Sequence, residues 1–397
     1  MGDYSAIAPG TDLPSYAREL VQIHDAVISG SRSSLRPRAV VSRSWSRVLQ
    51  LGLDADGQNP RQMLSVDEVE DLRRASPLSR VIDGLQRVVT SVADASHFLM
   101  VVTDADGVIL WRKGASAVCR RADSLGFAHG ARWTEAAVGT NAIGTALTEA
   151  APVQLFSGEH FEQAQHPWYC TAYPIHDPRT GDLLGIVDVS GPALTLHPAI
   201  GALVETAVLL AESQLWQHHE RSLEQLRAST AAVLAGLNGP MLVVDRDGWV
   251  AHSVGVAARD RVAVPRADKP LAVPGLGVCL PEPVGQGWLV RPVTAGRTIT
   301  VRLQPGSEPT LEVDSEAGVW RSALSRRHAE ILQILHGAGP AGQTARQLSA
   351  ALFGDVEHVV SVRAEISRLR RTCGAIVTGS PYRISEGVTL VLAGPEA

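Results

Sequence analysis

The stretch between Ala202 and Gly236 contains neither proline nor glycine, the two residues that most often end a helix. Its sequence, LVETAVLLAESQLWQHHERSLEQLRASTAAVLA, therefore predicts one long helix between two parts of the chain that both carry strand patterns. This helix either packs on its own domain or serves as a linker that also pairs two protomers, and the pattern leaves both interpretations open. The residues that would form one apolar seam are Leu215, Leu223, Leu226, Val233 and Leu237.

The residues before this helix predict helices first and then an α+β domain. Apolar residues recur at three- and four-residue spacing within 14–75, which favours helices there. After a further helix come two strand, turn, strand patterns, HFLMVVTDADGVILWRKG and WYCTAYPIHDPRTGDLLGIVDVSG. We therefore expect an N-terminal helical region over 1–75, an α+β domain over 76–215 and a linker helix over 216–238.

The residues after the long helix predict a β-rich domain and a helical module. GPMLVVDRDGWVAHSVG and GWLVRPVTAGRTITVRLQP are strand, turn, strand patterns, so 239–318 is expected to form a small β-rich domain. Its opening segment resembles the start of a PAS domain. Ser325 and Thr344 are suitable N-caps for two helices, and HVVSVRAEISRLRRTCG predicts a third. With AIVTGSPYRISEGVTLVL as a β-hairpin, 319–397 is expected to contain three helices and a hairpin.

The C-terminal module reverses the charge of the chain. Residues 321–383 hold nine arginines and four acidic residues, a net charge of +5, whereas the whole chain carries −5 and the remainder −10. Such asymmetry is typical of a nucleic-acid-binding module on an acidic body. The third helix gathers small residues and guanidinium groups opposite its apolar face, an arrangement that can enter a DNA major groove; the alternative is a solvated surface. The candidate DNA-binding residues are Arg363, Ser367, Arg368, Arg370, Arg371 and, in the hairpin, Arg383.

The order of these motifs resembles the winged helix-turn-helix of OmpR/PhoB-type response regulators. LSRRHAEIL, VRAEISRLRR and IVTGSPYRI follow one another as in that family. There the third helix reads the major groove and the hairpin, or wing, touches the minor groove. The resemblance implies promoter DNA as a partner.

The segment GTNAIGTAL, Gly139 to Leu147, sets glycines beside threonines and raises the question of a binding site. It lacks the lysine of a phosphate loop and the glycine spacing of a dinucleotide site, so neither is predicted. The segment is too apolar for an exposed loop, and glycine permits close approach, so it favours the wall of a pocket for a small organic ligand. The candidate ligand-binding residues are Trp133, Glu135, Asn141, Thr145, His160, Phe161, Cys170 and Tyr173.

Four motifs carry a resemblance to a known family. VVSRSWSRVLQLGL, WTEAAVGTNAIGTAL, the pair His160-Phe161 and CTAYPIHDPRTGDLLGIVDVSG are similar to the N-terminal half of the acetoin-catabolism activators, whose sensor is a GAF domain. The resemblance implies a GAF sensor domain over 76–215 that binds a small effector. Those activators continue into an AAA+ ATPase, and this sequence has no Walker motif after residue 215, so ATP-driven activation is not expected.

Cysteine and histidine usage leaves an alternative open. His160, His166, Cys170 and His176 lie close in sequence, so a haem- or thiol-based redox sensor is the second hypothesis. The favoured interpretation is structural, with His160 and Cys170 packed around a pocket and His166 and His176 in turns. No catalytic set is present, so no enzyme activity, metal or cofactor is expected. Scattered cysteines, no signal-peptide pattern and no apolar run of membrane length favour a cytoplasmic protein with no membrane contact.

These patterns predict an α+β multidomain transcription factor that senses a small organic metabolite. Activation is expected by analogy with the acetoin-catabolism activators. The expected partners are promoter DNA, the effector and a second copy of the chain in a homodimer, with RNA polymerase as a further candidate.

Overall fold

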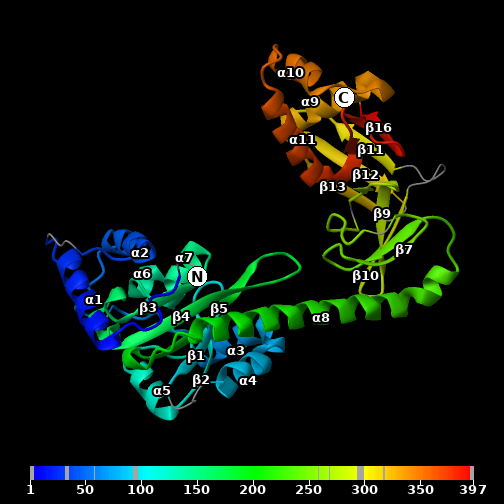
Figure 1. The fold of residues 1–397 in the computed structure, drawn as a ribbon. Helices are drawn as coiled ribbons and strands as arrows, with labels where there is room; N and C mark the ends of the chain where they lie inside the picture. Colours follow the sequence, from blue (N-terminus) through cyan, green and yellow to red (C-terminus); the bar gives the residue numbers. More distant parts are fainter. Residues whose placement is uncertain are drawn as a thin grey trace. The chain divides into compact units, whose positions relative to one another are not determined.

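The chain forms a mixed α/β structure of several sheets, which divides into two compact units, Met1–His219 and Glu220–Ala397 (Figure 1). This multidomain architecture agrees with the expected fold class. The computed structural model describes residues 4–31, 35–57, 59–92, 97–257, 259–267, 269–292, 299–315 and 318–393.

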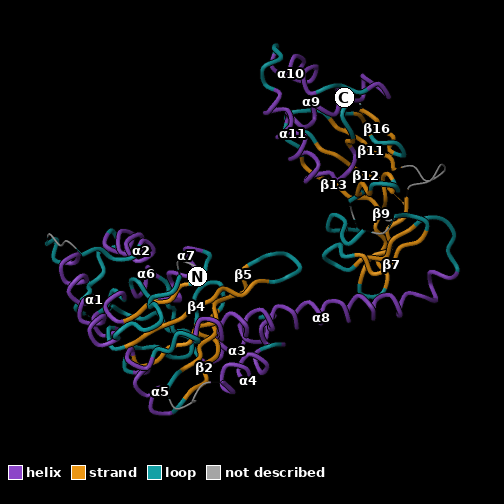
Figure 2. Tube along the Cα trace, in the orientation of Figure 1, coloured by secondary structure: helices purple, strands orange, loops and turns teal. Residues whose placement is uncertain are grey.

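A five-stranded antiparallel sheet is the centre of the first unit, in the order β2-β1-β5-β4-β3 (Figures 1 and 2). Both strand, turn, strand predictions are confirmed, because β1 pairs with β2 and β4 pairs with β5, each antiparallel. The strands are β1 (Leu99–Thr103), β2 (Ile109–Gly114), β3 (Val153–Phe156), β4 (Trp168–His176) and β5 (Leu183–Pro192).

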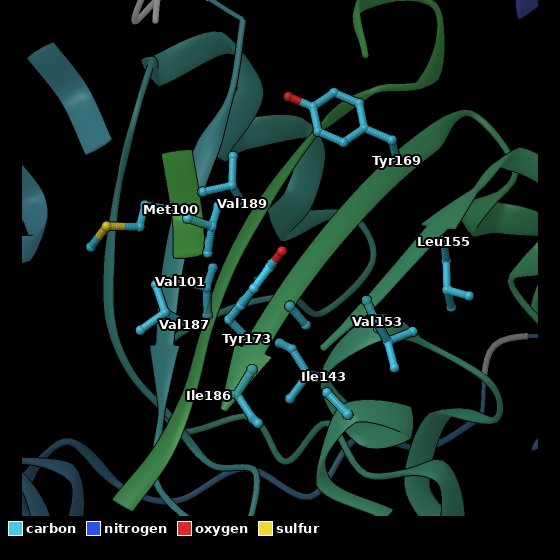
Figure 3. Close-up of a cluster of buried hydrophobic side chains, with 14 of the residues drawn as sticks. Met100, Val101, Ile143, Val153, Leu155, Tyr169, Tyr173, Ile186, Val187 and Val189 are labelled. Carbon is cyan, nitrogen blue, oxygen red and sulfur yellow. The ribbon is translucent and has the colours of Figure 1, made fainter. Parts of the chain in front are cut away.

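Helices cover both faces of this sheet, and β5 is accordingly buried along most of its length. α7 packs on β3, β4 and β5, whereas Gly201 of α8 lies beside the Tyr173 hydroxyl on the other face. Figure 3 shows part of the core, with Val153 and Leu155 of β3. The helices are α1 (Leu13–Ile28), α2 (Ala39–Leu49), α3 (Val66–Ala75), α4 (Ile82–Val92), α5 (Ser116–Asp123), α6 (Glu135–Val138), α7 (Ala142–Glu149) and α8 (Ile200–Ala235).

The N-terminal helices share the core of this sheet. Leu20 of α1 and Trp45 of α2 are buried in one hydrophobic cluster with the strands. Arginines of the N-terminal segment also pair with carboxylates that are almost fully buried in the rest of the unit. The pairs are Arg38 with Glu159, Arg47 with Glu135 and Arg61 with Glu162. The first unit therefore has no structural boundary at residue 75, where the sequence analysis placed one.

The long helix is confirmed as α8, and most of its predicted seam packs on the chain's own sheets. Leu215 is buried in the core of the first unit. Leu226 packs in the second unit beside Met241 and Leu289, while Val233 is 51% exposed. Most of the seam therefore packs within the two units, and the pairing of two protomers through this helix stays a prediction.

After the end of α8, the second unit contains another five-stranded antiparallel sheet, in the order β7-β6-β10-β9-β8. The strand, turn, strand pattern after residue 239 is confirmed, since β6 pairs with β7. The second such pattern is wrong as a hairpin, because β10 pairs with β6 and β9 and the next strand enters a different sheet; its expected turn, 293–298, lies outside the described residues. The strands are β6 (Met241–Val244), β7 (Val250–Val254), β8 (Leu271–Val273), β9 (Gly277–Val284) and β10 (Gly287–Pro292).

Residues 299–393 share one further core, which joins a four-stranded sheet to three helices. The sheet order is β13-β12-β11-β16, and β16 lies parallel to β11. The expected domain boundary at 318/319 is therefore wrong, because it separates strands of one sheet. The elements are β11 (Ile299–Gln304), β12 (Thr310–Ser315), β13 (Gly318–Ala323), α9 (Arg326–Ala338), α10 (Ala345–Phe353), α11 (Val359–Cys373), β14 (Val377–Thr378), β15 (Arg383–Ile384) and β16 (Val388–Leu392).

Local signals placed the three helices correctly. Ser325 Oγ accepts a hydrogen bond from the His328 backbone, and Thr344 forms a capping box with Gln347. The predicted hairpin is confirmed only in its first part. β14 and β15 pair with each other, but the last predicted strand leaves the hairpin and becomes β16.

Candidate ligand cavity and candidate DNA-binding face

A small cavity lies between one face of the first sheet and the N-terminal end of α7. Cys170 of β4 and Ser190 of β5 are paired in register, and Asp188 lies two residues from Ser190, so all three side chains share this face. The cavity has a volume of about 20 Å³, which is room for about one water molecule. Its walls are Leu125, Phe127, Trp133, Asn141, Ala142, Ile143, Gln165, Trp168, Cys170, Asp188 and Ser190.

Asp188 is the buried acidic residue among those that line this cavity. Ser190 Oγ lies 2.5 Å from Asp188 Oδ2 and 3.1 Å from Cys170 Sγ. Asp188 Oδ1 accepts no hydrogen bond of standard geometry from the described residues. Burial raises the pKa of Asp188 to about 7, outweighing the hydrogen bonds that lower it. The carboxyl group therefore exchanges its proton near neutral pH.

The stability of the first unit is expected to fall as pH rises between about 4 and 7 because of Asp188. An exposed aspartate titrates near 3.9, so in this window the unfolded chain releases a proton that the folded chain keeps. The cost reaches up to about 4 kcal/mol above pH 7. Cys170 does not share this titration, because burial and the nearby Asp188 raise the pKa of its thiol well above the usual value.

Calorimetry of the full chain and of Asp188→Asn across this pH window checks the expectation. The Tm of the variant relative to wild type should rise with pH, by roughly 2–4 °C for each kcal/mol lost by wild type. Parallel pH profiles of the two proteins would contradict a raised pKa at Asp188.

The glycine-rich segment is the start of a helix that forms one wall of the cavity. Asn141 is the N-cap of α7, and its Oδ1 accepts a hydrogen bond from the Gly144 backbone at 2.9 Å. Gly139 has a φ of +76°, and Phe161 packs so closely on it that a Cβ there would lie 2.4 Å from the ring. Asn141, Ala142 and Ile143 of this segment line the cavity, as the interpretation as a pocket wall requires.

Gly144→Ala is expected to destabilise the first unit by roughly 1–3 kcal/mol, as overpacking does. The new Cβ would lie 2.4 Å from Glu135 N and 2.7 Å from Thr134 C, and these backbone atoms cannot swing aside. Gly201→Ala on α8 is the matched control, since its nearest neighbours lie at 3.5 Å, an ordinary contact. Thermal unfolding of both variants gives the test; equal Tm values would contradict the close approach at Gly144.

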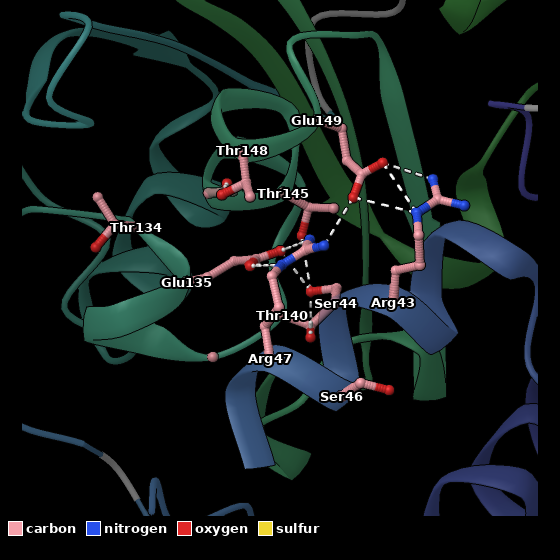
Figure 4. A network of polar contacts seen from close by, with 12 residues as sticks. Arg43, Ser44, Ser46, Arg47, Thr134, Glu135, Thr140, Thr145, Thr148 and Glu149 are labelled. Atoms are coloured by element: carbon pink, nitrogen blue, oxygen red, sulfur yellow. Dashed lines mark hydrogen bonds and ion pairs between the residues drawn. The ribbon is translucent and has the colours of Figure 1, made fainter. Parts of the chain in front are cut away.

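Two predicted ligand-binding residues, Glu135 and Thr145, instead join α2 to α6 and α7 (Figure 4). Arg47 donates to both carboxylate oxygens of Glu135 at 2.8 Å, and Ser44 donates to the same group at 2.6 Å. Ser44 Oγ also lies 2.7 Å from Thr140 Oγ1 and 3.3 Å from Thr145 Oγ1. The prediction for Glu135 and Thr145 is therefore corrected, because their polar groups are directed to this junction and they do not line the cavity.

Three more predicted ligand-binding residues also lie outside the cavity lining. Tyr173 is on the other face of the sheet, because β4 side chains alternate and Cys170 faces the cavity. Phe161 packs on Gly139, and its backbone bonds to Thr140. His160 is buried, with Nδ1 3.0 Å from the Ser157 carbonyl. Of the eight candidates, Trp133, Asn141 and Cys170 line the cavity.

The sequence analysis missed Asp188 and Ser190. The signal was the strand GIVDVSG, in which an aspartate and a serine interrupt an apolar run at the two-residue spacing of one strand face. The distant contributors Leu125, Phe127 and Gln165 had no local signal, because the fold alone brings them to the cavity.

The geometry gives little support to the metal and redox alternatives. Within the described ranges, no group of three or more histidine, cysteine or acidic side chains is arranged to hold a metal ion. Burial lowers the pKa of both His160 and His166 to about 4, and His176 lies near Glu212. The raised pKa of the Cys170 thiol disfavours the thiolate that redox sensing needs.

The candidate DNA-binding face is the exposed side of α11. Val362, Ile366, Leu369 and Cys373 of this helix are buried in the C-terminal core, as the predicted amphipathic pattern requires. Arg363, Ser367, Arg368, Arg370 and Arg371 are exposed on the remaining surface of the helix.

The arginines of this face differ in their partners. Arg363, Ser367 and Arg371 follow at four-residue spacing and so form one row. Neither Arg363 nor Arg371 has a side-chain partner in the part of the chain that the structure describes. Arg368 instead pairs with Glu365 at 2.7 Å.

Arg370 and Arg383 are connected to the hairpin. Arg370 donates to the Val377 carbonyl at 3.0 Å and lies over the Tyr382 ring, so it braces the hairpin against α11. Arg383 begins β15 opposite Thr378. The hydrogen bond to Val377 and the contact with the Tyr382 ring indicate that Arg370 contributes to the structure, in addition to any contact with DNA.

Comparisons with known proteins relate the chain to transcriptional regulators. Residues 24–213 match the family model described as MimR, N-terminal domain. Over 387 residues the chain is 31% identical to a 47.3 kDa protein in the thcA 5′ region of Rhodococcus erythropolis, an alignment that covers 96% of this chain and 72% of that protein.

Two activators match the first half of the chain. The acetoin dehydrogenase operon transcriptional activator AcoR of Bacillus subtilis is 31% identical over 205 residues, covering 51% of this chain and 33% of the activator. The propane 2-monooxygenase operon transcriptional activator MimR of Mycolicibacterium smegmatis is 28% identical over 229 residues, an alignment that covers 54% of this chain and 38% of the activator. The chain thus spans well under half of either activator. It is related to activators of catabolic operons.

Among the described residues, none of the helices is both long and apolar enough to cross a membrane.

Proposed function

Because this chain belongs to the same family as the 47.3 kDa protein of Rhodococcus erythropolis, and carries a MimR N-terminal domain, we propose that it is a metabolite-responsive transcriptional regulator. In this proposal the first unit is a GAF sensor that binds a small organic molecule. Residues 299–393 form a winged helix-turn-helix that binds promoter DNA through α11. Activation is proposed from the named activators that share the N-terminal domain.

The observation that carries the DNA-binding part is the exposed row of Arg363, Ser367 and Arg371 on α11. The opposite face of this helix is buried, so the helix is held rigidly with its guanidinium groups in solvent. Arginine in such a position can read guanine or bind phosphate. The hairpin β14–β15, braced by Arg370, occupies the place of a wing.

Contacts within the second unit support a route from the β6–β10 sheet to α11. The Ala375 backbone N–H donates to the Pro270 carbonyl at 2.9 Å, and Lys269 Nζ donates to the Arg371 carbonyl at 3.2 Å. Both contacts lie at the C-terminal end of α11. A ligand that favours the DNA-competent arrangement by about 1–3 kcal/mol would suffice for regulation.

The proposal includes a homodimer on two half-sites, contact with RNA polymerase and action in the cytoplasm. Mapping the full chain on its own genome by cross-linking and sequencing tests it. One or a few discrete sites upstream of an operon are expected, and the neighbouring genes then indicate which metabolites to test. Uniform or absent enrichment would contradict a sequence-specific regulator.

A further inference from the structure

A groove of about 780 Å³ lies in the second unit, at the C-terminal end of α11. One wall comes from 263–272, between β7 and β8, and the other from 370–379, which runs from the last turn of α11 into the hairpin. No acidic residue is among the groove-lining residues that the structure describes. The two segments together carry four cationic residues and one acidic residue, a net charge of +3, so the groove attracts an anion. The charged lining residues are Arg266, Lys269, Arg370 and Arg371.

Backbone contacts hold the two walls of the groove together. The Ala375 N–H donates to the Pro270 carbonyl at 2.9 Å, and a Cβ on Gly374 would lie 2.3 Å from the same carbonyl oxygen. Arg266 and Lys269 are opposite each other in an antiparallel bridge, so their side chains leave the backbone on the same side. The two cations of the β7–β8 segment are therefore held beside the end of α11.

The end of α11 would repel an anion by itself, because the carbonyl end of a helix carries about half a negative elementary charge. Lys269 Nζ donates to the Arg371 carbonyl at 3.2 Å and so offsets this charge. Arg370 and Arg371 add two guanidinium groups in the last turn of the helix, and Arg266 is exposed. Four full positive charges thus outweigh the helix dipole, and the groove is positive.

The groove continues the proposed DNA-binding face. Arg371 belongs both to the exposed row on α11 and to the groove lining. A DNA duplex carries one negative charge for about every 1.7 Å of its axis, so a duplex at this row brings further phosphates to the neighbouring cations. A long polyanion fits this continuity better than a small free anion, because it can contact the row and the groove at the same time.

We propose that Arg266 and Lys269 bind the phosphate backbone of DNA beside α11, so that the β-rich sheet contributes directly to DNA binding. This inference rests on the proposed winged-helix function and adds a second element to its DNA contact. Phosphate contacts carry no sequence information. The groove should therefore strengthen binding to every duplex, while α11 supplies the sequence preference.

The test uses the groove variant, Arg266→Ala with Lys269→Gln, in the full chain. Fluorescence anisotropy measures its binding to the best genomic site and to a mixed-sequence duplex of equal length. Affinity should fall roughly ten- to hundredfold on both duplexes at about 100 mM salt. The slope of log affinity against log salt should become shallower by about two units, because each lost phosphate contact removes about 0.9.

A matched control separates the groove from net charge. Arg246→Ala with Arg259→Ala removes the same charge from two exposed positions of the second unit that do not line the groove, and should keep the wild-type slope. Because Lys269 also contacts the end of α11, Arg266→Ala alone gives a test that does not depend on that contact. Its slope should become shallower by about one unit at an unchanged Tm. Wild-type affinity and slope in the groove variant would overturn the inference.

The same measurements separate this inference from the regulator proposal. If the groove variant matches wild type on a genomic site that the Arg363→Ala, Arg371→Ala variant no longer binds, the groove contact alone is contradicted. If the chain binds all duplexes alike and the groove variant loses that binding, the contact stands and the sequence-specific regulator is contradicted. Binding of ATP that is lost in the groove variant, with DNA binding unchanged, would assign the groove to a free phosphate compound and overturn the DNA contact.

Discussion

The double variant Arg363→Ala, Arg371→Ala is expected to lose DNA affinity by about two to four orders of magnitude. Both side chains are exposed in one row of α11, and neither has a side-chain partner in the described part of the chain. Each lost arginine contact costs about 1–3 kcal/mol at a base pair, and the two losses add when the contacts are separate. Arg368 should contribute less, because Glu365 already neutralises it.

Fluorescence anisotropy on the best genomic site measures this loss. Arg246→Ala is the control, since Arg246 lies in the exposed β6–β7 turn and its removal changes net charge by one unit without touching α11. The double variant should melt at the wild-type temperature, because neither arginine packs in the core. Wild-type affinity in the double variant would show that another face binds DNA.

Arg61→Met is expected to destabilise the first unit by about 3–5 kcal/mol. Glu162 is fully buried, and Arg61 contacts it through two nitrogen atoms, at 2.5 and 3.0 Å. Removing the arginine leaves a buried carboxylate with hydrogen bonds from Asn59 and Gln165 but without a counter-ion. For a unit of this size, the loss corresponds to a fall in Tm of roughly 6–20 °C.

The double variant Arg61→Met, Glu162→Gln isolates the electrostatic cause. It removes both charges, so part of the lost stability should return. Arg74→Met is the exposed control: its pair with Asp71 is solvent-exposed and should contribute no more than about 1 kcal/mol. A Tm for Arg61→Met within a few degrees of that control would contradict the importance of the buried pair.

Local patterns were sufficient to predict most elements of the fold. Neighbouring residues signal the helix caps at Ser325 and Thr344, the long helix α8 and three of the four strand, turn, strand patterns expected before residue 319. The partners of the strands are not signalled locally. β10 and β11 read as one hairpin but join different sheets, because pairing depends on residues distant in sequence.

The candidate site likewise contains residues that local motifs signal and residues whose neighbours only the fold supplies. Trp133, Asn141 and Cys170 were predicted because their motifs combine aromatic, amide and thiol groups with glycine. Glu135 and Thr145 carry the same kind of chemistry, but α2 supplies Arg47 and Ser44 to them, and a single motif does not show which neighbour will arrive. Asp188 stands out in the sequence as an acidic residue within an apolar strand. Its position beside the cavity follows only from the register of β4 and β5.

The most direct test of the regulator account is a salt titration of the purified full chain on its best genomic site. With about four phosphate contacts, affinity should fall roughly a hundredfold between about 50 and 200 mM salt. The Arg363→Ala, Arg371→Ala variant should bind this site more weakly than wild type at every salt concentration. Weak binding that does not depend on salt, and that is the same in the variant, would contradict DNA recognition by α11.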